Sequence, residues 1–116
     1  MNWIDLADEA QLTAIKQEST EKPVVIFKHS TRCSISAMVK NRLDKAAQPD
    51  NIKFYYLDLL QYRNISNKIA EDFQVHHESP QVLLIKNGEC IYEESHNGIF
   101  MEEIAEQIAW FDVMVW

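Results

Sequence analysis

Glycine and proline are scarce in this chain of 116 residues, which contains 2 glycines and 3 prolines. Linkers and low-complexity regions are usually rich in these residues, so no boundary is visible inside the chain. The chain has no internal repeat, and its length lies within the usual range of one domain. We therefore expect a single domain over residues 1–116.

Long apolar runs are also missing. No stretch approaches the roughly 18 residues that a membrane span requires. The first residues, Met1 to Asp5, have neither the basic start nor the apolar segment of a signal peptide. We therefore expect the chain to stay in the reducing cytosol. Its two cysteines, Cys33 and Cys90, lie far apart in the sequence, and a structural disulfide is uncommon in that compartment.

Positive charge is in short supply, since 11 Lys and Arg face 18 Asp and Glu and the net charge is −7. Nucleic acids and anionic membranes are bound by clustered Lys and Arg, so we expect neither as a partner. Metal ligands are not indicated either. His76 and His77 are adjacent, and neither lies at ligand spacing from a cysteine.

The sequence alternates between segments typical of helices and of strands. Apolar residues at helical spacing predict helices over residues 5–19, 33–47, 64–73 and 101–110. β-Branched and aromatic runs predict strands over residues 24–27, 52–57, 82–85 and 90–93. Asn87-Gly88 indicates a hairpin between the last two strands, and the helical connections favour parallel pairing elsewhere. We expect an α/β fold with a central four-stranded mixed sheet flanked by helices on both faces.

Cys33 stands where a predicted buried strand and a short polar loop lead into a predicted helix. Free backbone N–H groups and the helix dipole stabilise negative charge there, and the thiolate is the reactive form of cysteine. Arg32 adds a positive charge, and we expect the hydroxyls of Ser34 and Ser36 to donate hydrogen bonds to the sulfur. Cys33 is therefore the predicted nucleophile. The alternative is a buried structural cysteine.

The segment from Cys33 to Ser36 lacks the second cysteine of a Cys-x-x-Cys motif. A mixed disulfide on Cys33 must then be attacked by a small thiol, by another protein, or by Cys90 after a conformational change. Cys90 precedes Ile91 in a predicted strand, and the favoured interpretation is a small hydrophobe packed in the sheet.

Ser79 and Pro80 precede a predicted strand, where proline is compatible with a turn. Few X–Pro bonds are cis, but a cis bond here would turn the Ser79 N–H and C=O outward to pair with an extended substrate. His29 and His96 are expected near the site. Each is either a ligand contact or proton relay, or a solvated loop histidine.

Three segments together resemble the monothiol bacilliredoxin family, thioredoxin-like proteins of the bacillithiol system. They run from Val24 to Ser36, from His77 to Gln81 and from Lys86 to Glu89. The resemblance covers nearly the whole chain. It implies a thioredoxin-like fold with Cys33 as the nucleophile and Pro80 as a cis-proline beside it.

The same resemblance implies a thiol–disulfide oxidoreductase that removes a bacillithiol-like, low-molecular-weight thiol from mixed disulfides on client proteins. The small thiol is then a co-substrate, and no tightly bound cofactor is implied. Thr31, Arg32 and Ser36 would line the site, and His96 would contact the ligand. A proline often follows the reactive cysteine in this family. Ser34 stands there instead and keeps its N–H as a donor.

Two other functions are compatible with the same residues. One is a non-catalytic thioredoxin-fold module, in which Cys33 senses the redox state and the surface around Pro80 binds a peptide. The other is a peroxidase, for which the chain lacks a Pro-x-x-x-Thr-x-x-Cys arrangement around its cysteine.

Overall fold

Strands and helices alternate along residues 1–114, the part of the chain that the computed structural model describes. The strands are β1 (Trp3–Asp5), β2 (Val24–His29), β3 (Lys53–Asp58), β4 (Gln81–Lys86) and β5 (Glu89–Ser95). The helices are α1 (Glu9–Glu18), α2 (Ser34–Lys45), α3 (Arg63–Asp72) and α4 (Met101–Met114), with a short 3-10 helix η1 (His96–Gly98) before α4. The last two residues of the predicted domain lie outside the described part.

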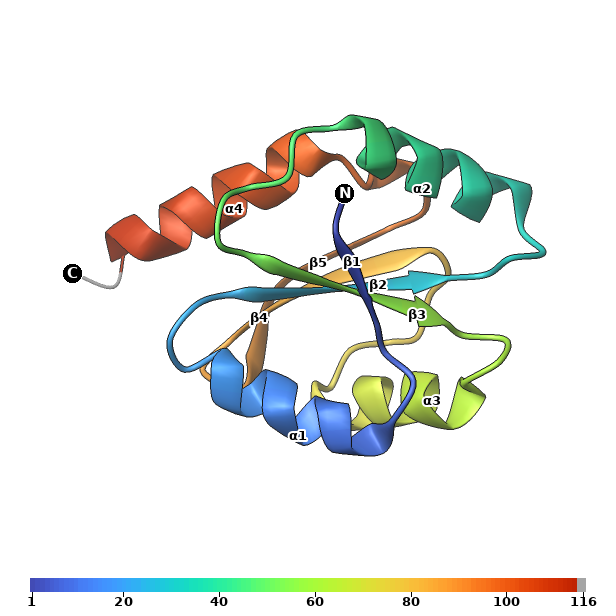
Figure 1. Cartoon of the computed structure of the whole chain (residues 1–116), viewed down its shortest axis with the longest axis horizontal. Helices are drawn as coiled ribbons and strands as arrows, with labels where there is room; N and C mark the ends of the chain where they lie inside the picture. Colours follow the sequence, from blue (N-terminus) through green and yellow to red (C-terminus); the bar gives the residue numbers. More distant parts are fainter. Residues whose placement is uncertain (115–116) are drawn as a thin grey trace.

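The strands form one mixed sheet in the order β1-β3-β2-β4-β5. β1 and β2 both pair in parallel with β3, and β4 runs antiparallel to β2 and β5. Helices α1 and α3 cover one face of the sheet, and α2 and α4 cover the other (Figure 1). The predicted mixed sheet with helices on both faces is confirmed.

The sheet has five strands rather than the predicted four, because β1 was not foreseen. Trp3 pairs with Phe54 of β3, and its indole N–H donates a hydrogen bond of 2.6 Å to the Asp44 carboxylate of α2. A strand of three residues is too short to show a period of its own, so its partners decide its conformation.

Helix α1 begins at Glu9, four residues later than predicted, because Asp8 forms its N-cap. The Asp8 carboxylate accepts a hydrogen bond from the Ala10 N–H at 2.8 Å. The side chain of Gln11 accepts one from the Asp8 N–H at 3.0 Å. This capping box satisfies backbone donors that the helix leaves free, and it separates α1 from β1.

Strand β2 contributes to the apolar cores on both faces, because all six of its residues are buried. Val24 and Ile26 pack in the core beneath α1 and α3. Val25 and Phe27 pack in the core beneath α2 and α4. Alternation along the strand therefore directs His29 to the α2 face. The loop that carries Cys33 starts from the end of this fixed strand.

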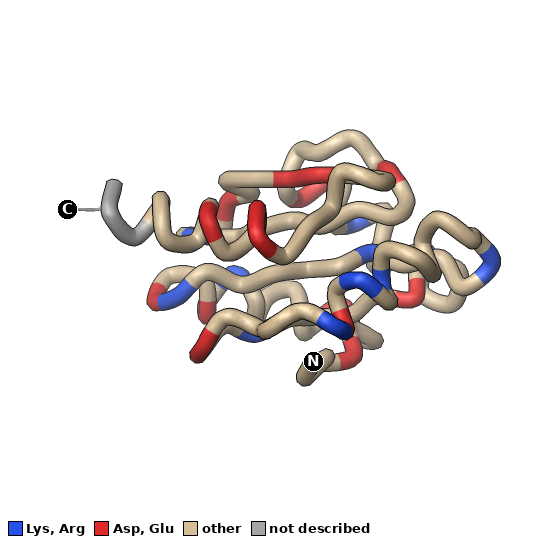
Figure 2. The backbone as a smooth tube through the Cα atoms, turned by 90° about the horizontal axis from the view of Figure 1, so that it is seen from above, with Lys and Arg blue, Asp and Glu red and all other residues tan. Residues whose placement is uncertain are grey.

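Acidic residues lie along β5 and the neighbouring helix α4 (Figure 2). They are Glu89, Glu93 and Glu94 in β5, and Glu102, Glu103 and Glu106 in α4. β5 is an edge strand, and charged residues on an edge oppose pairing with another chain. Within residues 1–114, no helix combines the length and the apolar character that crossing a membrane would take.

Candidate active site

Cys33 is the N-cap residue of α2, at the helix start that the sequence predicts. Its carbonyl accepts a hydrogen bond from the Ala37 N–H at 3.0 Å, and its own N–H donates to the Ser30 carbonyl at 3.2 Å. The side chain forms no capping hydrogen bond, and the thiol is free and partly exposed. Cys33 therefore stands at the helix start, where backbone N–H groups have no helical partner, and part of the residue is open to solvent.

Three predicted site residues, Thr31, Arg32 and Ser34, are exposed next to Cys33. In the described part of the chain, none of their side chains forms a hydrogen bond with protein. They are available to an incoming molecule, and their predicted roles at the sulfur stay predictions.

Ser36 contacts partners other than the predicted one. We expected its hydroxyl to donate to the Cys33 sulfur. Instead the fully buried Oγ lies 2.7 Å from Nδ1 of His29 and accepts a hydrogen bond from the Ser30 N–H at 3.1 Å. The reason is that Ser36 faces the sheet, where the end of β2 presents an imidazole and a free N–H.

His29 is buried beneath the start of α2, with a relative exposure of 5%. Its ring packs beside those of Phe27 and Tyr56, at centroid distances of 5.8 and 5.6 Å. Burial lowers the pKa of His29, and the nearby charge of Lys40 lowers it further. The imidazole is therefore neutral at neutral pH. The sequence placed His29 near the site but did not predict its burial.

Pro80 lies at the same end of the sheet. Lys28 of β2 is opposite Gln81 of β4, so the next residues outward, His29 and Pro80, are neighbours on the α2 face. The Ser79–Pro80 peptide bond is cis, and Pro80 is buried. The register thus places Pro80 next to His29, whose ring lies beneath the first turn of α2.

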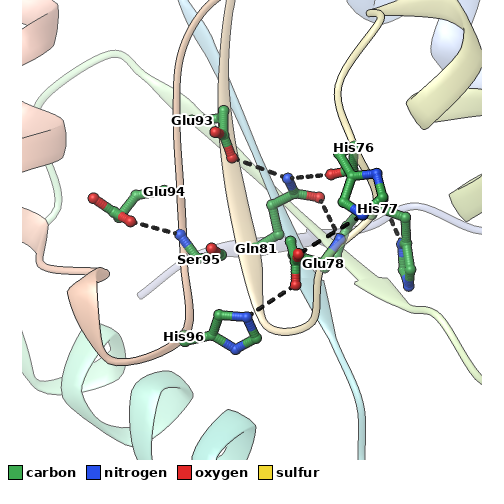
Figure 3. Close-up of polar contacts among 9 residues, drawn as sticks. His76, His77, Glu78, Gln81, Glu93, Glu94, Ser95 and His96 are labelled. Atoms are coloured by element: carbon green, nitrogen blue, oxygen red, sulfur yellow. Dashed lines mark hydrogen bonds and ion pairs between the residues drawn. The ribbon is translucent and has the colours of Figure 1, made fainter.

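His96 borders Pro80 on the other side. Its N–H donates to the Pro80 carbonyl at 2.9 Å, and its Nε2 lies 2.9 Å from a carboxylate oxygen of Glu78 (Figure 3). The φ angle of His96 is 57°, in the left-handed region that favours glycine. Arg42 of α2 donates to the Asn97 carbonyl at 3.2 Å, which ties this turn to the helix that Cys33 starts.

Among the side chains of residues 1–111, Ser79 carries the one buried oxygen or nitrogen that has no hydrogen-bond partner. Leaving a buried hydroxyl unpaired costs about 1–3 kcal/mol. Such groups in native proteins call for an explanation, and a functional site is one.

Gln81 holds the segment before Pro80 in place, a role that the sequence analysis missed. Its amide nitrogen donates to the His76 carbonyl and to the Glu93 carboxylate, both at 3.0 Å (Figure 3). Its amide oxygen accepts from the Glu78 N–H at 3.3 Å. The available signal was a polar residue at the start of an apolar run, directly after Pro80.

Lys28 is a second residue that the analysis missed. It is fully buried on the α3 face, where its Nζ lies 3.0 Å from Nδ1 of His77. Burial lowers the pKa of Lys28 to about 8. Partial desolvation of its own ring, together with the charge of Lys28, lowers the pKa of His77. No local signal marked it, because Lys28 directly follows the apolar run of residues 24–27 and begins a polar stretch.

Replacing Lys28 with methionine is expected to stabilise the protein near neutral pH. The pKa of Lys28 is about 8 when folded, against 10.5 as its ordinary value. The unfolded chain therefore binds the proton first, and stability falls as the pH drops from about 10.5 through about 8. Lys28→Met removes this loss, and urea unfolding at pH 7 should show a gain of about 1–3 kcal/mol.

The exposed Lys45 provides the control, because Lys45→Met should change stability by less than about 0.5 kcal/mol. Between pH 8 and 10 the stability of Lys28→Met should vary less than that of the wild type. Parallel pH curves for these two proteins would contradict the assignment.

Cys90 lies at the opposite end of the sheet from Cys33. Cys90 pairs with Ile85 of β4, and Ile85 pairs with Val24 at the beginning of β2. Cys33, in contrast, follows the last residue of β2. A strand of this length spans about 16 Å. The Cys90 thiol donates to the Tyr92 carbonyl at 3.3 Å, and burial raises its pKa to about 11. Cys90 is thus a packed thiol that cannot reach Cys33 in this fold.

Among the side chains of residues 1–111, no group of three or more His, Cys, Asp and Glu is arranged to hold a metal ion.

Comparisons with known proteins identify the family and the fold of the chain. The family model described as monothiol bacilliredoxin BrxC matches residues 4–104. A solved structure of a candidate oxidoreductase with a thioredoxin fold is 33% identical, with a TM-score of 0.79, over 90% of this chain and 91% of that one.

Two thioredoxins have the same fold at lower identity. The Malassezia sympodialis thioredoxin is 17% identical over 95% of this chain and 90% of its own, with a TM-score of 0.70. The Fasciola hepatica thioredoxin is 19% identical over 90% of this chain and 95% of its own, with a TM-score of 0.68. The predicted thioredoxin-like fold is confirmed.

Proposed function

Because the chain belongs to the monothiol bacilliredoxin family, we propose that it is a cytosolic thiol–disulfide oxidoreductase that removes a bacillithiol-like small thiol from mixed disulfides on client proteins. One observation carries the proposal. Cys33 is a free, partly exposed thiol at the N-cap of α2, and the other cysteine lies at the far end of the sheet. A cysteine so placed performs thiol exchange with molecules from outside.

The reaction has two balanced steps. In the first, the Cys33 thiolate attacks the sulfur of the small thiol in the mixed disulfide. The client leaves as a thiolate and takes a proton from solvent, and the small thiol is now bonded to Cys33. In the second step, the thiolate of another small-thiol molecule attacks this adduct, which releases an oxidised dimer of the small thiol and restores the Cys33 thiolate.

The surrounding residues have proposed parts in both steps. The backbone N–H groups at the start of α2 and the charge of Arg32 stabilise the thiolate. Thr31 and the Ser34 N–H line the approach to the sulfur. The backbone of Ser79 pairs with the extended part of the substrate, and His96 contacts the small thiol at the rim.

The proposal is tested by following the mass of the intact protein. A test protein carrying one mixed disulfide with bacillithiol, glutathione or coenzyme A is mixed with the reduced chain in three parallel reactions. We expect the chain to gain the mass of the small thiol on Cys33 while the test protein loses it, fastest with bacillithiol. Peptide mapping should find Cys90 unmodified.

Failure of transfer from all three mixed disulfides would contradict the proposal. Retained binding of a client peptide around Pro80 would then favour the non-catalytic binding module. Equal rates with the three thiols would leave the oxidoreductase activity intact but remove the preference for bacillithiol.

A further inference from the structure

The Ser36 hydroxyl, which follows Cys33 in the sequence, forms hydrogen bonds with His29 and Ser30, which precede it. Ser36 occupies the fourth position of the Cys33 to Ser36 segment, where a dithiol site has its second cysteine, and it is fully buried. Its Oγ accepts a hydrogen bond from the Ser30 N–H, and the Ser30 carbonyl accepts one from the Cys33 N–H. The turn that presents the sulfur is therefore fastened to the helix through this hydroxyl.

Counting donors and acceptors fixes the direction of the bond between Ser36 and His29. Ser36 has one hydroxyl proton, and in the described residues its Oγ contacts only the Ser30 N–H and Nδ1 of His29. The N–H is a donor, so the hydroxyl proton satisfies both groups by pointing at Nδ1. The neutral imidazole then carries its proton on Nε2.

His29 is held so that it can keep this bond. Its ring is buried beneath α2 and packs against the rings of Phe27 and Tyr56, at centroid distances of 5.8 and 5.6 Å. Burial lowers the pKa of His29, so Nδ1 remains an acceptor at neutral pH. Nδ1 of His29 therefore fixes the orientation of the Ser36 hydroxyl, and this hydroxyl in turn anchors the turn over residues 30–33 through the Ser30 N–H.

We propose that His29 and Ser36 are positioning residues for Cys33, which hold the turn over residues 30–33 so that the sulfur meets a disulfide bound beside Pro80. The inference rests on the proposed function, because attack on a disulfide needs alignment of the incoming sulfur with the bond that breaks. A misplacement of about 1 Å can slow such a step by about a hundredfold. Neither residue exchanges a proton with the substrate.

The test compares four variants in the transfer assay. Ser36→Ala removes the hydroxyl. His29→Asn retains a polar atom near the place of Nδ1, whereas His29→Gln moves it toward the place of Nε2. Ser66→Ala is the matched control, because Ser66 is also a buried serine beside a histidine, 3.4 Å from Nδ1 of His77, on the α3 face of the sheet.

We expect Ser36→Ala and His29→Gln to slow transfer about tenfold, in line with losing one hydrogen bond from an aligned site. His29→Asn should stay within about threefold of the wild type, and Ser66→Ala within about twofold. The reaction with iodoacetamide at high pH, where the thiol is ionised and nothing needs docking, should change less than twofold in all four. Hydrogen exchange of the Ser30 amide should speed up in Ser36→Ala by about tenfold.

The positioning proposal is overturned if Ser36→Ala transfers the small thiol as fast as Ser66→Ala, or if its Ser30 amide stays protected. It is also overturned if the substitution in Ser36→Ala slows the iodoacetamide reaction by the same factor as the transfer reaction. The defect would then lie in the reactivity of the thiol itself. Absence of transfer by the wild type contradicts the proposed function. In that case, the rate at which Cys33 reacts with a small aromatic disulfide is measured in place of transfer. The same order of rates among the four variants supports the positioning role, and equal rates overturn it.

Discussion

Replacing Cys33 with serine is expected to abolish small-thiol transfer to below detection. A serine hydroxyl stays protonated at neutral pH without an adjacent base, and it cannot form the mixed disulfide on which both steps depend. Cys33 is partly exposed and its side chain makes no capping hydrogen bond, so the fold should lose less than about 0.5 kcal/mol. The measurement is the intact-mass assay, with urea unfolding to check the fold.

Cys90→Ala is the matched control for this variant. Cys90 is packed at the far end of the sheet, and its thiol is held by the Tyr92 carbonyl. Its replacement should leave the transfer rate within about twofold of the wild type, because its thiol takes no part in exchange. Loss of transfer in Cys90→Ala, or substantial transfer by Cys33→Ser, would show that the nucleophile has been misassigned.

The largest loss of stability is expected from Phe27→Ala. Phe27 is fully buried in the core beneath α2 and α4, and its ring stacks on that of Trp3 at 5.5 Å. Truncating such a residue removes its apolar burial and leaves a cavity, which together cost about 3–5 kcal/mol. Since small domains are stable by about 5–15 kcal/mol, this variant should unfold at a much lower urea concentration.

Phe100 serves as the control for Phe27, because it is 44% exposed and its ring lies 4.2 Å from the Arg42 guanidinium. Phe100→Ala loses a surface cation–π contact and little burial, so the free energy of unfolding should fall by less than about 1 kcal/mol. Similar losses in the two variants would contradict the core described for the α2 face.

The central strands and the position of Cys33 could be predicted because their causes are local. The run of β-branched and aromatic residues from Val24 to Phe27 lies within β2. Asn87-Gly88 connects β4 to β5, and Asn87 has the positive φ angle of 54° that such a turn needs. The start of α2 followed from a polar loop between this continuous run and a segment with apolar residues at helical spacing.

Other features depend on contacts that no local pattern reveals. β1 forms because β3 offers it an edge and Asp44 accepts the Trp3 indole N–H. The partner of Ser36 was predicted wrongly because helical spacing brings it toward Cys33 but does not show that the end of β2 presents His29. The burial of Lys28 follows from its place in a strand that is covered on both faces, although it begins a polar stretch of the sequence.

The distance between the two cysteines determines how the fraction of chains that carry a small thiol on Cys33 depends on the concentrations of that thiol and its disulfide. Cys90 is too far away to serve as an internal partner, so under the proposed function the adduct on Cys33 is expected to form by the exchange of one small disulfide for one small thiol. The concentrations of both species enter that equilibrium to the first power. At equilibrium the fraction of loaded chains therefore follows the ratio of oxidised to reduced small thiol and is independent of their total amount. An internal dithiol pair would depend on the square of the reduced concentration instead.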